Sequence, residues 1–417
     1  MTTNDAVRED AARGFWPTVK TFPSTVIALL FFTLVIRFSY FMAWPFMTVI
    51  MTRNYHLSPI SVGVAMTSSA LLAVVLGMYG GQLSDKLGRR GVLSLGCALS
   101  FVGYALLGLA TGMALFIIGL MIVGVCFAWV EPPTRALMSD LLGDRRRRAL
   151  ALQIRYYLVN VAAVTGPLVG IAFGLTSQKG TFVITAVSYL PLLIYTLLFI
   201  PAGKLVAKES EHSAGVRLRD VMLIIARDKL FVAALLCSML CAVVFVHYES
   251  VVPLYLLTLD AGAAVKLITL ILVSNACTVL IAQLFLVRFL AQVSLSNRIL
   301  LGGAIFALSQ FLFWSVRTPD ALLWVSVTVI FSIGEAILMP NLNILLDQLA
   351  PDEHRGAYLG ASTLTTLGIA LGPLIGGVML TLTGEGVFLG TMLFSLLLCA
   401  IIYACKSGLK QRLQEKY

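Results

Sequence analysis

The sequence has few charged residues for its length. Only 12% of its 417 residues are Asp, Glu, Lys or Arg, whereas 59% are hydrophobic and the mean hydropathy is +0.94. Soluble domains carry about 25% charged residues. This scarcity excludes an ordinary soluble domain and predicts an all-α integral membrane protein that crosses the bilayer many times.

Acidic residues are scarcer than basic ones, 20 against 30, so the formal net charge is +10. A basic excess that forms one patch indicates a nucleic-acid partner. Here the bases lie in the polar segments on one side of successive apolar runs and at both ends of the chain. The terminal ones are Arg8, Arg13, Lys20, Lys406, Lys410, Arg412 and Lys416. This positive-inside pattern predicts no nucleic-acid partner and a multi-pass protein of the bacterial inner (cytoplasmic) membrane with both termini cytoplasmic.

Histidine and cysteine are also few, with four and seven residues. The cysteines lie in apolar runs without the spacing of a metal site or a disulfide framework, and we interpret them as small packing residues. They are Cys97, Cys126, Cys237, Cys241, Cys277, Cys399 and Cys405. Without a phosphate-binding loop or a nucleophile–base pair, the sequence disfavours an enzyme or a sensor and predicts no metal and no cofactor. Polar residues 1–23 before a run long enough to span indicate no cleavable signal peptide.

Twelve apolar runs each approach the ~20 residues that span a bilayer. They begin near Ser24, Ile60, Val92, Met113, Ala149, Phe182, Lys229, Ala264, Arg298, Leu322, Gly356 and Val387. The longest polar interruption divides them into six-helix bundles at 24–200 and 229–405, with a cytoplasmic segment 1–23, a cytoplasmic linker 201–228 and a tail 406–417. Within the linker, Val216–Ala226 fits an interfacial helix or a solvated connector.

The two halves repeat one another. Pro133, Asp140 and Arg148 in the first half recur 207 residues later as Pro340, Asp347 and Arg355. The segment Gly166-Pro167-x-x-Gly170 recurs 206 residues later as Gly372-Pro373-x-x-Gly376, which Gly368 precedes by one turn. Such segments let helices pack closely and bend. A duplication of six spans lets a two-bundle transporter place a site between its halves.

One motif is more specific than the rest: Gly81-x-Leu83-x-Asp85-x-x-Gly88-Arg89-Arg90-x-x-Leu93. It predicts a tight cytoplasmic hairpin between two helices, in which Gly81 allows close packing and Gly88 a backbone bend. The motif resembles the signature of the major facilitator superfamily between helices 2 and 3. That resemblance implies a 12-helix fold of two bundles and a gate in which Asp85 lies near Gly356 at the start of span 11 and Arg89 reaches Asp140.

Three shorter segments resemble multidrug:proton antiporters of that superfamily. Residues 166–170 resemble the antiporter motif, with Ala162 in place of its leading glycine. The segment Gly334-Glu335-Ala336 with Pro340 resembles LmrP-type antiporters. The segment Glu131-Pro132-Pro133 resembles MdtH-type exporters. The sequence also departs from the pattern. Leu120 stands where many such antiporters carry an arginine four residues before a glycine, here Gly124, and no copy of the signature follows span 8.

Ionisable residues within apolar runs are costly and are therefore candidate functional groups. They are Arg37, Glu131, His247, Glu249 and Glu335. In the facilitator fold the helices that carry them line the central cavity, so the resemblance places them around one water-filled space. The three glutamates are candidate proton carriers or fixed ion-pair partners, and His247 is a proton relay or a packing residue. Arg37 either holds an acid ionised or binds an anionic substrate group.

The same helices carry aromatic and methionine side chains suited to lipophilic or cationic ligands. In addition to Arg37, Glu131 and Glu335, the candidates for substrate binding are Phe41, Trp44, Phe46, Trp129, Tyr248, Phe331 and Met339. Each can equally face lipid or a neighbouring helix. The formal charges of one arginine and three glutamates sum to −2, which favours the binding of protons and cations.

The sequence therefore predicts a monomeric secondary transporter that exports amphipathic or cationic small molecules by alternating access, with the proton gradient as its energy source. The alternative is a facilitator, by symport or uniport, for a defined metabolite or a lipid-like substrate. An anionic metabolite would then bind Arg37.

Overall fold

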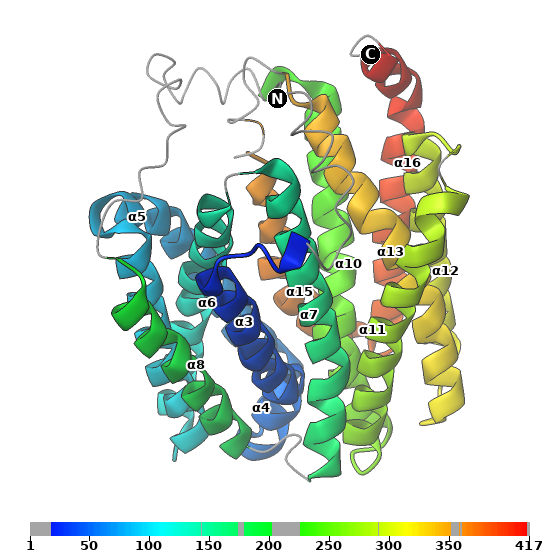
Figure 1. Cartoon of the computed structure of the whole chain (residues 1–417). Helices are drawn as coiled ribbons and strands as arrows, with labels where there is room; N and C mark the ends of the chain where they lie inside the picture. Colours follow the sequence, from blue (N-terminus) through cyan, green and yellow to red (C-terminus); the bar gives the residue numbers. More distant parts are fainter. Residues whose placement is uncertain are drawn as a thin grey trace, which may run out of the picture.

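The protein has helices and no strands in the part that the computed structural model describes. That part comprises residues 18–142, 144–173, 179–201, 226–290, 292–351, 358 and 361–414, without the side chains of 78–87, 127, 145, 146, 284, 287, 288, 413 and 414. Twelve of its helical stretches are long and apolar enough to cross a membrane. The helices stand side by side (Figure 1), which confirms the predicted all-α membrane fold.

The first bundle holds spans 1 to 6. Its elements are α3 (Ser24–Ala43), η1 (Trp44–Phe46), α4 (Met47–Tyr55), α5 (Pro59–Leu109), α6 (Met113–Leu141), α7 (Arg145–Ala172) and α8 (Gly180–Phe199). The 3-10 turn η1 begins with Trp44 and Pro45 and joins α3 to α4 as one span. Helix α5 supplies two spans, Pro59–Gly77 and Gly88–Leu109.

The second bundle holds spans 7 to 12. Its elements are α10 (Lys229–Leu259), α11 (Ala264–Phe289), α12 (Leu295–Ser315), α13 (Ala321–Leu349), η3 (Thr363–Thr365), α15 (Thr366–Thr383) and α16 (Gly386–Gln414). The predicted starts agree within a few residues except for span 11, which begins at Thr363. Gly356, its predicted start, lies outside the described residues, as does the possible interfacial helix apart from Ala226.

The predicted tight turn between two helices falls within α5, where two helical spans meet at one kink with helical residues on both sides of it. At the kink Gly88 has φ 70° and ψ 166°, a backbone conformation that favours glycine. One residue in this conformation reverses the chain while its neighbours remain helical, so no loop is needed. The predicted bend at Gly88 is therefore confirmed. The side chain of Asp85 and the packing of Gly81 lie outside the described residues.

The repeated Gly–Pro segments pack in the same way in both halves. A Cβ atom on Gly166 of α7 would lie 2.8 Å from the carbonyl oxygen of Phe38 in α3. A Cβ atom on Gly372 of α15 would lie 2.5 Å from a Val246 methyl in α10. Span 5 thus packs on span 1 as span 11 packs on span 7. The glycines are required because these helices touch at the backbone.

The two bundles approach most closely at one end. We call the end that holds Ser24 and Gln414 the terminal face and the opposite end, where Pro59 begins α5, the far face. Near the far face a Cβ on Gly63 would lie 2.5 Å from the carbonyl oxygen of Pro373, and a Cβ on Gly377 would lie 2.4 Å from that of Pro59. Helices α5 and α15 therefore meet backbone to backbone across the two bundles.

Three hydrogen bonds between described residues also join the bundles. At the far face Arg53 donates to the Ala261 carbonyl, and the Leu374 amide donates to Thr67 Oγ1 over 3.2 Å. Nearer the terminal face Gln283 of α11 donates to the Tyr156 hydroxyl of α7 over 2.8 Å. More of the described contacts between the bundles therefore lie near the far face than near the terminal face.

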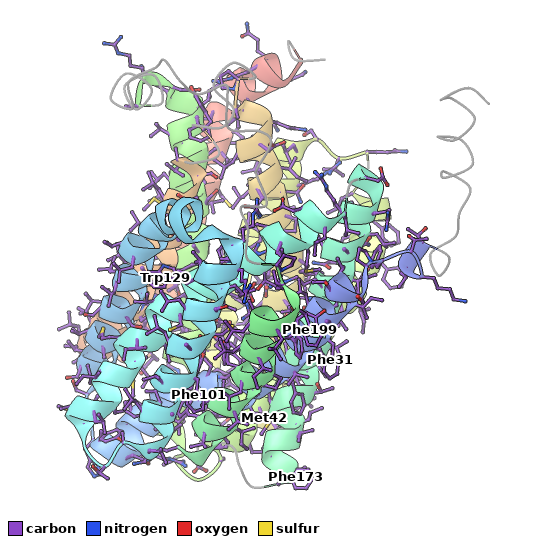
Figure 2. All side chains as sticks on the ribbon, turned by 60° about the vertical axis from the view of Figure 1, so that its left-hand side comes forward. Phe31, Met42, Phe101, Trp129, Phe173 and Phe199 are labelled. Carbon is purple, nitrogen blue, oxygen red and sulfur yellow. The ribbon has the colours of Figure 1, made fainter. Side chains whose placement is uncertain are left out.

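Large apolar side chains project from the outer surface of the bundles. Phe31 is 59% exposed, Phe199 64% and Phe173 73%, and Figure 2 shows them directed outward. In the same view Met42 lies among the helices and is buried. Exposed phenylalanines such as these would be costly in water and are expected to contact lipid.

An ion pair fastens the second bundle at the terminal face. The Asp228 carboxylate precedes α10, accepts from the Phe231 amide and receives two 2.7 Å bonds from Arg412 of α16. The Tyr358 hydroxyl donates to it over 3.0 Å. Burial opposes the ionised form of Asp228, but these hydrogen bonds outweigh burial and hold its pKa below its ordinary value.

We predict that Asp228→Asn lowers stability by about 1–2 kcal/mol, because asparagine keeps the helix cap but loses the charge that binds Arg412. Because the native pKa is depressed, the stabilisation is present at neutral pH and is lost as pH falls through that pKa. Thermal melts of the detergent-solubilised protein measure both effects. The matched control is Asp320→Asn, which alters a cap bonded to the Leu323 amide. An equal shift for the two variants would contradict the account.

Candidate functional site

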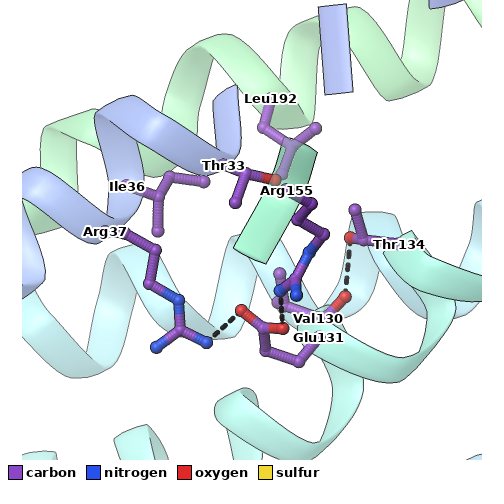
Figure 3. Close-up of a pocket in the computed structure, with 8 residues that line it drawn as sticks. All are labelled: Thr33, Ile36, Arg37, Val130, Glu131, Thr134, Arg155 and Leu192. Atoms are coloured by element: carbon purple, nitrogen blue, oxygen red, sulfur yellow. Dashed lines mark hydrogen bonds and ion pairs between the residues drawn. The ribbon is translucent and has the colours of Figure 1, made fainter. Parts of the chain in front are cut away.

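The first bundle contains one buried acid held by two arginines. Glu131 of α6 accepts from Arg37 of α3 at Oε1 and from Arg155 of α7 at Oε2 (Figure 3). The three side chains are only 11–12% exposed. Arg135, one turn along α6, lies 3.8 Å from Oε2 and is half exposed. Glu131 is therefore a fixed ion-pair partner, which was one of its two predicted roles.

The local packing explains how these charges meet. Glu131 and Arg135 share one face of α6 because they are four residues apart. Arg37 and Arg155 meet this face from α3 and α7, two helices that the contact at Gly166 brings together. The pocket around them has an otherwise mostly apolar lining. Its other lining residues are Thr33, Ile36, Val130, Thr134 and Leu192.

The second bundle holds two acids without such partners. Glu335 of α13 accepts a 2.7 Å hydrogen bond from Asn275 of α11, which also donates to Ser332 over 2.9 Å. No ion pair joins Glu335 or Glu249 to a cation among the residues that the structure describes. The two carboxyl groups are close enough to interact electrostatically. We call Glu335 and Glu249 the acidic pair; the described hydrogen-bond partner of Glu335 is a neutral amide and not a cation.

Glu249 has an exposed side chain on an otherwise buried stretch of α10. Its neighbours Tyr248 and Ser250 are each 3% exposed. Helix α10 contacts α13, α15 and α16 of its own bundle and α4 and η1 of the other. Glu249 is thus an exposed acid on a helix that packs against both bundles.

His247 occupies a packing position, the second of its predicted roles. It is 3% exposed, and its Nε2 lies 2.9 Å from the Gly372 carbonyl oxygen. A Cβ on Gly376 would lie 2.9 Å from the same nitrogen. The ring is held between α10 and α15, so its geometry favours helix packing over proton relay.

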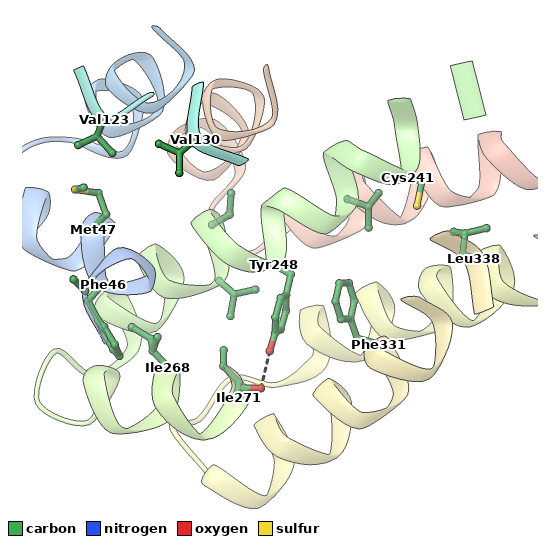
Figure 4. Close-up of a cluster of buried hydrophobic side chains, with 14 of the residues drawn as sticks. Phe46, Met47, Val123, Val130, Cys241, Tyr248, Ile268, Ile271, Phe331 and Leu338 are labelled. Atoms are coloured by element: carbon green, nitrogen blue, oxygen red, sulfur yellow. Dashed lines mark hydrogen bonds between the residues drawn. The ribbon is translucent and has the colours of Figure 1, made fainter. Parts of the chain in front are cut away.

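Three of the predicted ligand-binding aromatics belong to the packed core. Phe46 and Phe331 have no exposed surface, and Tyr248 stacks on Phe331 with ring centroids 4.5 Å apart (Figure 4). The Tyr248 hydroxyl donates to the Ile271 carbonyl oxygen over 2.8 Å. In this structure these three rings pack against neighbouring helices, which was the alternative that the sequence left open.

The remaining candidates are partly buried. Trp44 stacks on Tyr40 with centroids 5.5 Å apart, and Trp129 donates to the Leu76 carbonyl oxygen over 2.9 Å. Phe41 packs against Gly166, and Met339 packs against the core. Trp44 and Phe41 both contact Tyr40, whose ring lies 5.5 Å from the Arg37 guanidinium.

The signature motif makes one of its two expected contacts among the described side chains. Arg89 Nε lies 2.8 Å from Asp140 Oδ2, and Arg90 donates to the Leu197 carbonyl oxygen over 2.6 Å. These bonds tie the start of span 3 to the ends of spans 4 and 6. The expected position of Asp85 near Gly356 lies outside the described residues.

Three polar residues of the site were not among the sequence candidates. Arg155 lies within the predicted span 5 and Asn275 within span 8, and Arg135 follows Glu131 by one turn. A charge or an amide inside an apolar run was the signal that could have found the first two. Their inclusion changes the charge of the site, because three arginines and three glutamates now balance.

Two helical bundles around internal charged groups are the architecture of a secondary membrane transporter. A family model described as Major Facilitator Superfamily matches residues 29–366, so the chain belongs to that superfamily. The predicted family is thus confirmed.

The chain is similar to the transporter YqjV of Bacillus subtilis (strain 168), with 29% identity over 83% of each chain. It is also similar to the multidrug resistance protein MdtH of Shigella dysenteriae serotype 1 (strain Sd197), with 24% identity over 84% of this chain and 83% of that one. A crystal structure of a POT family transporter in complex with 5-aminolevulinic acid shares the fold, with TM-score 0.77 and 17% identity over 94% of this chain and 99% of the other.

We predict that Glu131→Gln destabilises the protein by about 3–5 kcal/mol, because it leaves Arg37 and Arg155 buried without their carboxylate. Melting of the purified protein in detergent measures the loss. The control is Glu385→Gln, which breaks an exposed pair with Arg317 and is expected to shift the melting temperature far less. A Glu131→Gln variant as stable as this control would show that the triad is not a structural element.

Proposed function

We propose that the protein is a proton-coupled antiporter that exports small molecules with a cationic, amphipathic character. Its terminal face lies in the cytoplasm and its far face outside a bacterial inner membrane, in keeping with the distribution of basic residues. The protein works as a monomer that opens its internal space alternately to the two sides.

The observation that carries this proposal is the contrast between the acids of the two bundles. Glu131 is neutralised by Arg37 and Arg155, so removing its charge would break two ion pairs. Glu335 and Glu249 have no described cationic partner, and Glu249 is exposed. These two acids can therefore exchange a proton or a cation at a lower cost than Glu131. We assign proton coupling to Glu335 with Glu249.

The close contact of α5 and α15 supports a conformation closed to the outside. The Gly63 and Gly377 contacts bring the two backbones together at the far face. In the proposed orientation a substrate enters from the cytoplasm while this contact persists. Opening outward requires the two helices to separate, and the Arg89–Asp140 pair keeps the cytoplasmic ends of spans 3 and 4 together as the bundle moves.

Exchange follows from competition at the acidic pair. A cationic substrate group and a proton both neutralise Glu335 and Glu249, so binding of one favours release of the other. A proton arriving from outside displaces the substrate there, and the protonated acids return to the cytoplasmic side. The name of the relative MdtH, a multidrug resistance protein, supports export as the direction.

We predict that Glu335→Gln abolishes uptake of tetraphenylphosphonium into everted vesicles driven by a proton gradient, because glutamine cannot release a proton. Binding of the cation should fall about tenfold or more, since one charge-assisted contact is lost. Glu249→Gln should reduce both the uptake and the binding of tetraphenylphosphonium, and the control Glu385→Gln should leave uptake and binding unchanged.

Gradient-driven uptake that persists in Glu335→Gln and in Glu249→Gln would refute proton coupling through these acids. A facilitator without proton coupling would then be the better account.

A further inference from the structure

Glu335 is bound by an amide group that donates to two side chains of one helix. Nδ2 of Asn275 in α11 lies 2.7 Å from Glu335 Oε2 and 2.9 Å from Ser332 Oγ. Ser332 and Glu335 are three residues apart on α13, so both lie on the face of that helix that α11 contacts. The NH2 end of an amide has two hydrogens to donate. Asn275 therefore uses one hydrogen for the serine and the other for the glutamate.

The serine fixes the direction of these bonds. The Ser332 hydroxyl donates its one hydrogen to the Thr328 carbonyl oxygen over 2.7 Å, so its oxygen is left to accept. The opposite orientation of the amide would turn Asn275 Oδ1 toward a hydroxyl whose hydrogen is already used. The amide thus presents a donor, and not an acceptor, to Glu335.

The turn of α11 that carries Asn275 is also held against α10. The Tyr248 hydroxyl donates to the Ile271 carbonyl oxygen over 2.8 Å (Figure 4). In an α-helix the carbonyl of residue 271 also accepts from the backbone N–H of residue 275. This turn therefore contacts the helices of both acids, α10 through Ile271 and α13 through Asn275.

The titratable groups that face Glu335 lie on one neighbouring helix. Helix α13 packs against α10, α11, α12 and α16. Three side chains of α10 interact electrostatically with Glu335, and no titratable group described on α11, α12 or α16 does so. The three are Cys241, Tyr248 and Glu249, and none of them carries a positive charge. The amide of Asn275 is therefore the described contact that favours a negative charge on Glu335.

We infer that Asn275 is a positioning residue that fixes the Glu335 carboxyl group and favours its ionised form. This inference rests on the proposed function and adds to it the residue that sets the pH at which this acid exchanges its proton. A hydrogen bond to an ionised acceptor is about twice as strong as one to a neutral acceptor. Without the amide, the protonated acid should therefore persist to higher pH than in the wild-type protein.

The test is infrared difference spectroscopy of the reconstituted full-length protein, titrated without substrate. The readout is the pH at which half of the Glu335-dependent protonated-carboxyl band has disappeared. Asn275→Leu has a side chain of similar shape without the donor, and we expect it to raise this pH by about one to two units. Asn275→Ala adds no bulk and should give the same shift, so it replaces Asn275→Leu if that variant does not fold.

Two further variants separate this role from packing. Ser332→Ala keeps Asn275 but removes the oxygen that fixes the direction of its amide, and it should raise the same pH by less than Asn275→Leu. The matched control is Asn160→Leu, which removes an amide of α7 that donates to the Tyr156 carbonyl oxygen of its own helix. The control should leave the titration unchanged.

An unchanged or lowered pH of half-loss in the folded Asn275 variants would overturn the inference, as would an equal shift in Asn160→Leu. The proposed function would survive that result, because the band would still depend on Glu335. A band of equal size in wild type and in Glu335→Gln would instead refute the proposed function and the inference with it.

Discussion

The cost of a charge inside the bilayer governs this structure. An ionised side chain there must be paired or must face water. The first bundle pairs its acid, since Glu131 holds Arg37 and Arg155 and so joins three helices. The second bundle leaves Glu249 accessible to water and gives Glu335 only the amide of Asn275. In the first bundle the charges hold helices together, whereas the two acids of the second bundle have no described cationic partner.

Close contacts of glycines with neighbouring helices set the geometry in which these charges meet. Gly166 brings α7 against α3, which places Arg155 beside Arg37, and Gly372 brings α15 against α10 next to His247. Gly63 and Gly377 repeat this device between the bundles. A side chain at any of these positions would push the helices apart. The internal charges and the closure of the far face therefore depend on the same kind of contact.

The sequence predicted the helices, the family and the repeat, because apolar length and glycine spacing act locally along the chain. It also found Arg37, Glu131, Glu249 and Glu335 from their positions within apolar runs. It did not predict their pairing, since which acid meets which base depends on how helices rotate and pack. The same limit explains why Phe331 and Tyr248, suited to a ligand by composition, stack on each other instead. The turn between spans 2 and 3 was predictable because its bend depends on one local residue, Gly88, whose backbone conformation favours glycine.

The central claim is that the acids of the second bundle exchange protons and that Glu131 does not. Infrared difference spectroscopy of the reconstituted protein, titrated between mildly acidic and mildly alkaline pH, tests it without any substrate. The account predicts a protonated-carboxyl band that disappears as pH rises, is reduced in Glu335→Gln and in Glu249→Gln, and is unchanged in a folded Glu131→Gln sample. A band that is lost only in Glu131→Gln would contradict the account.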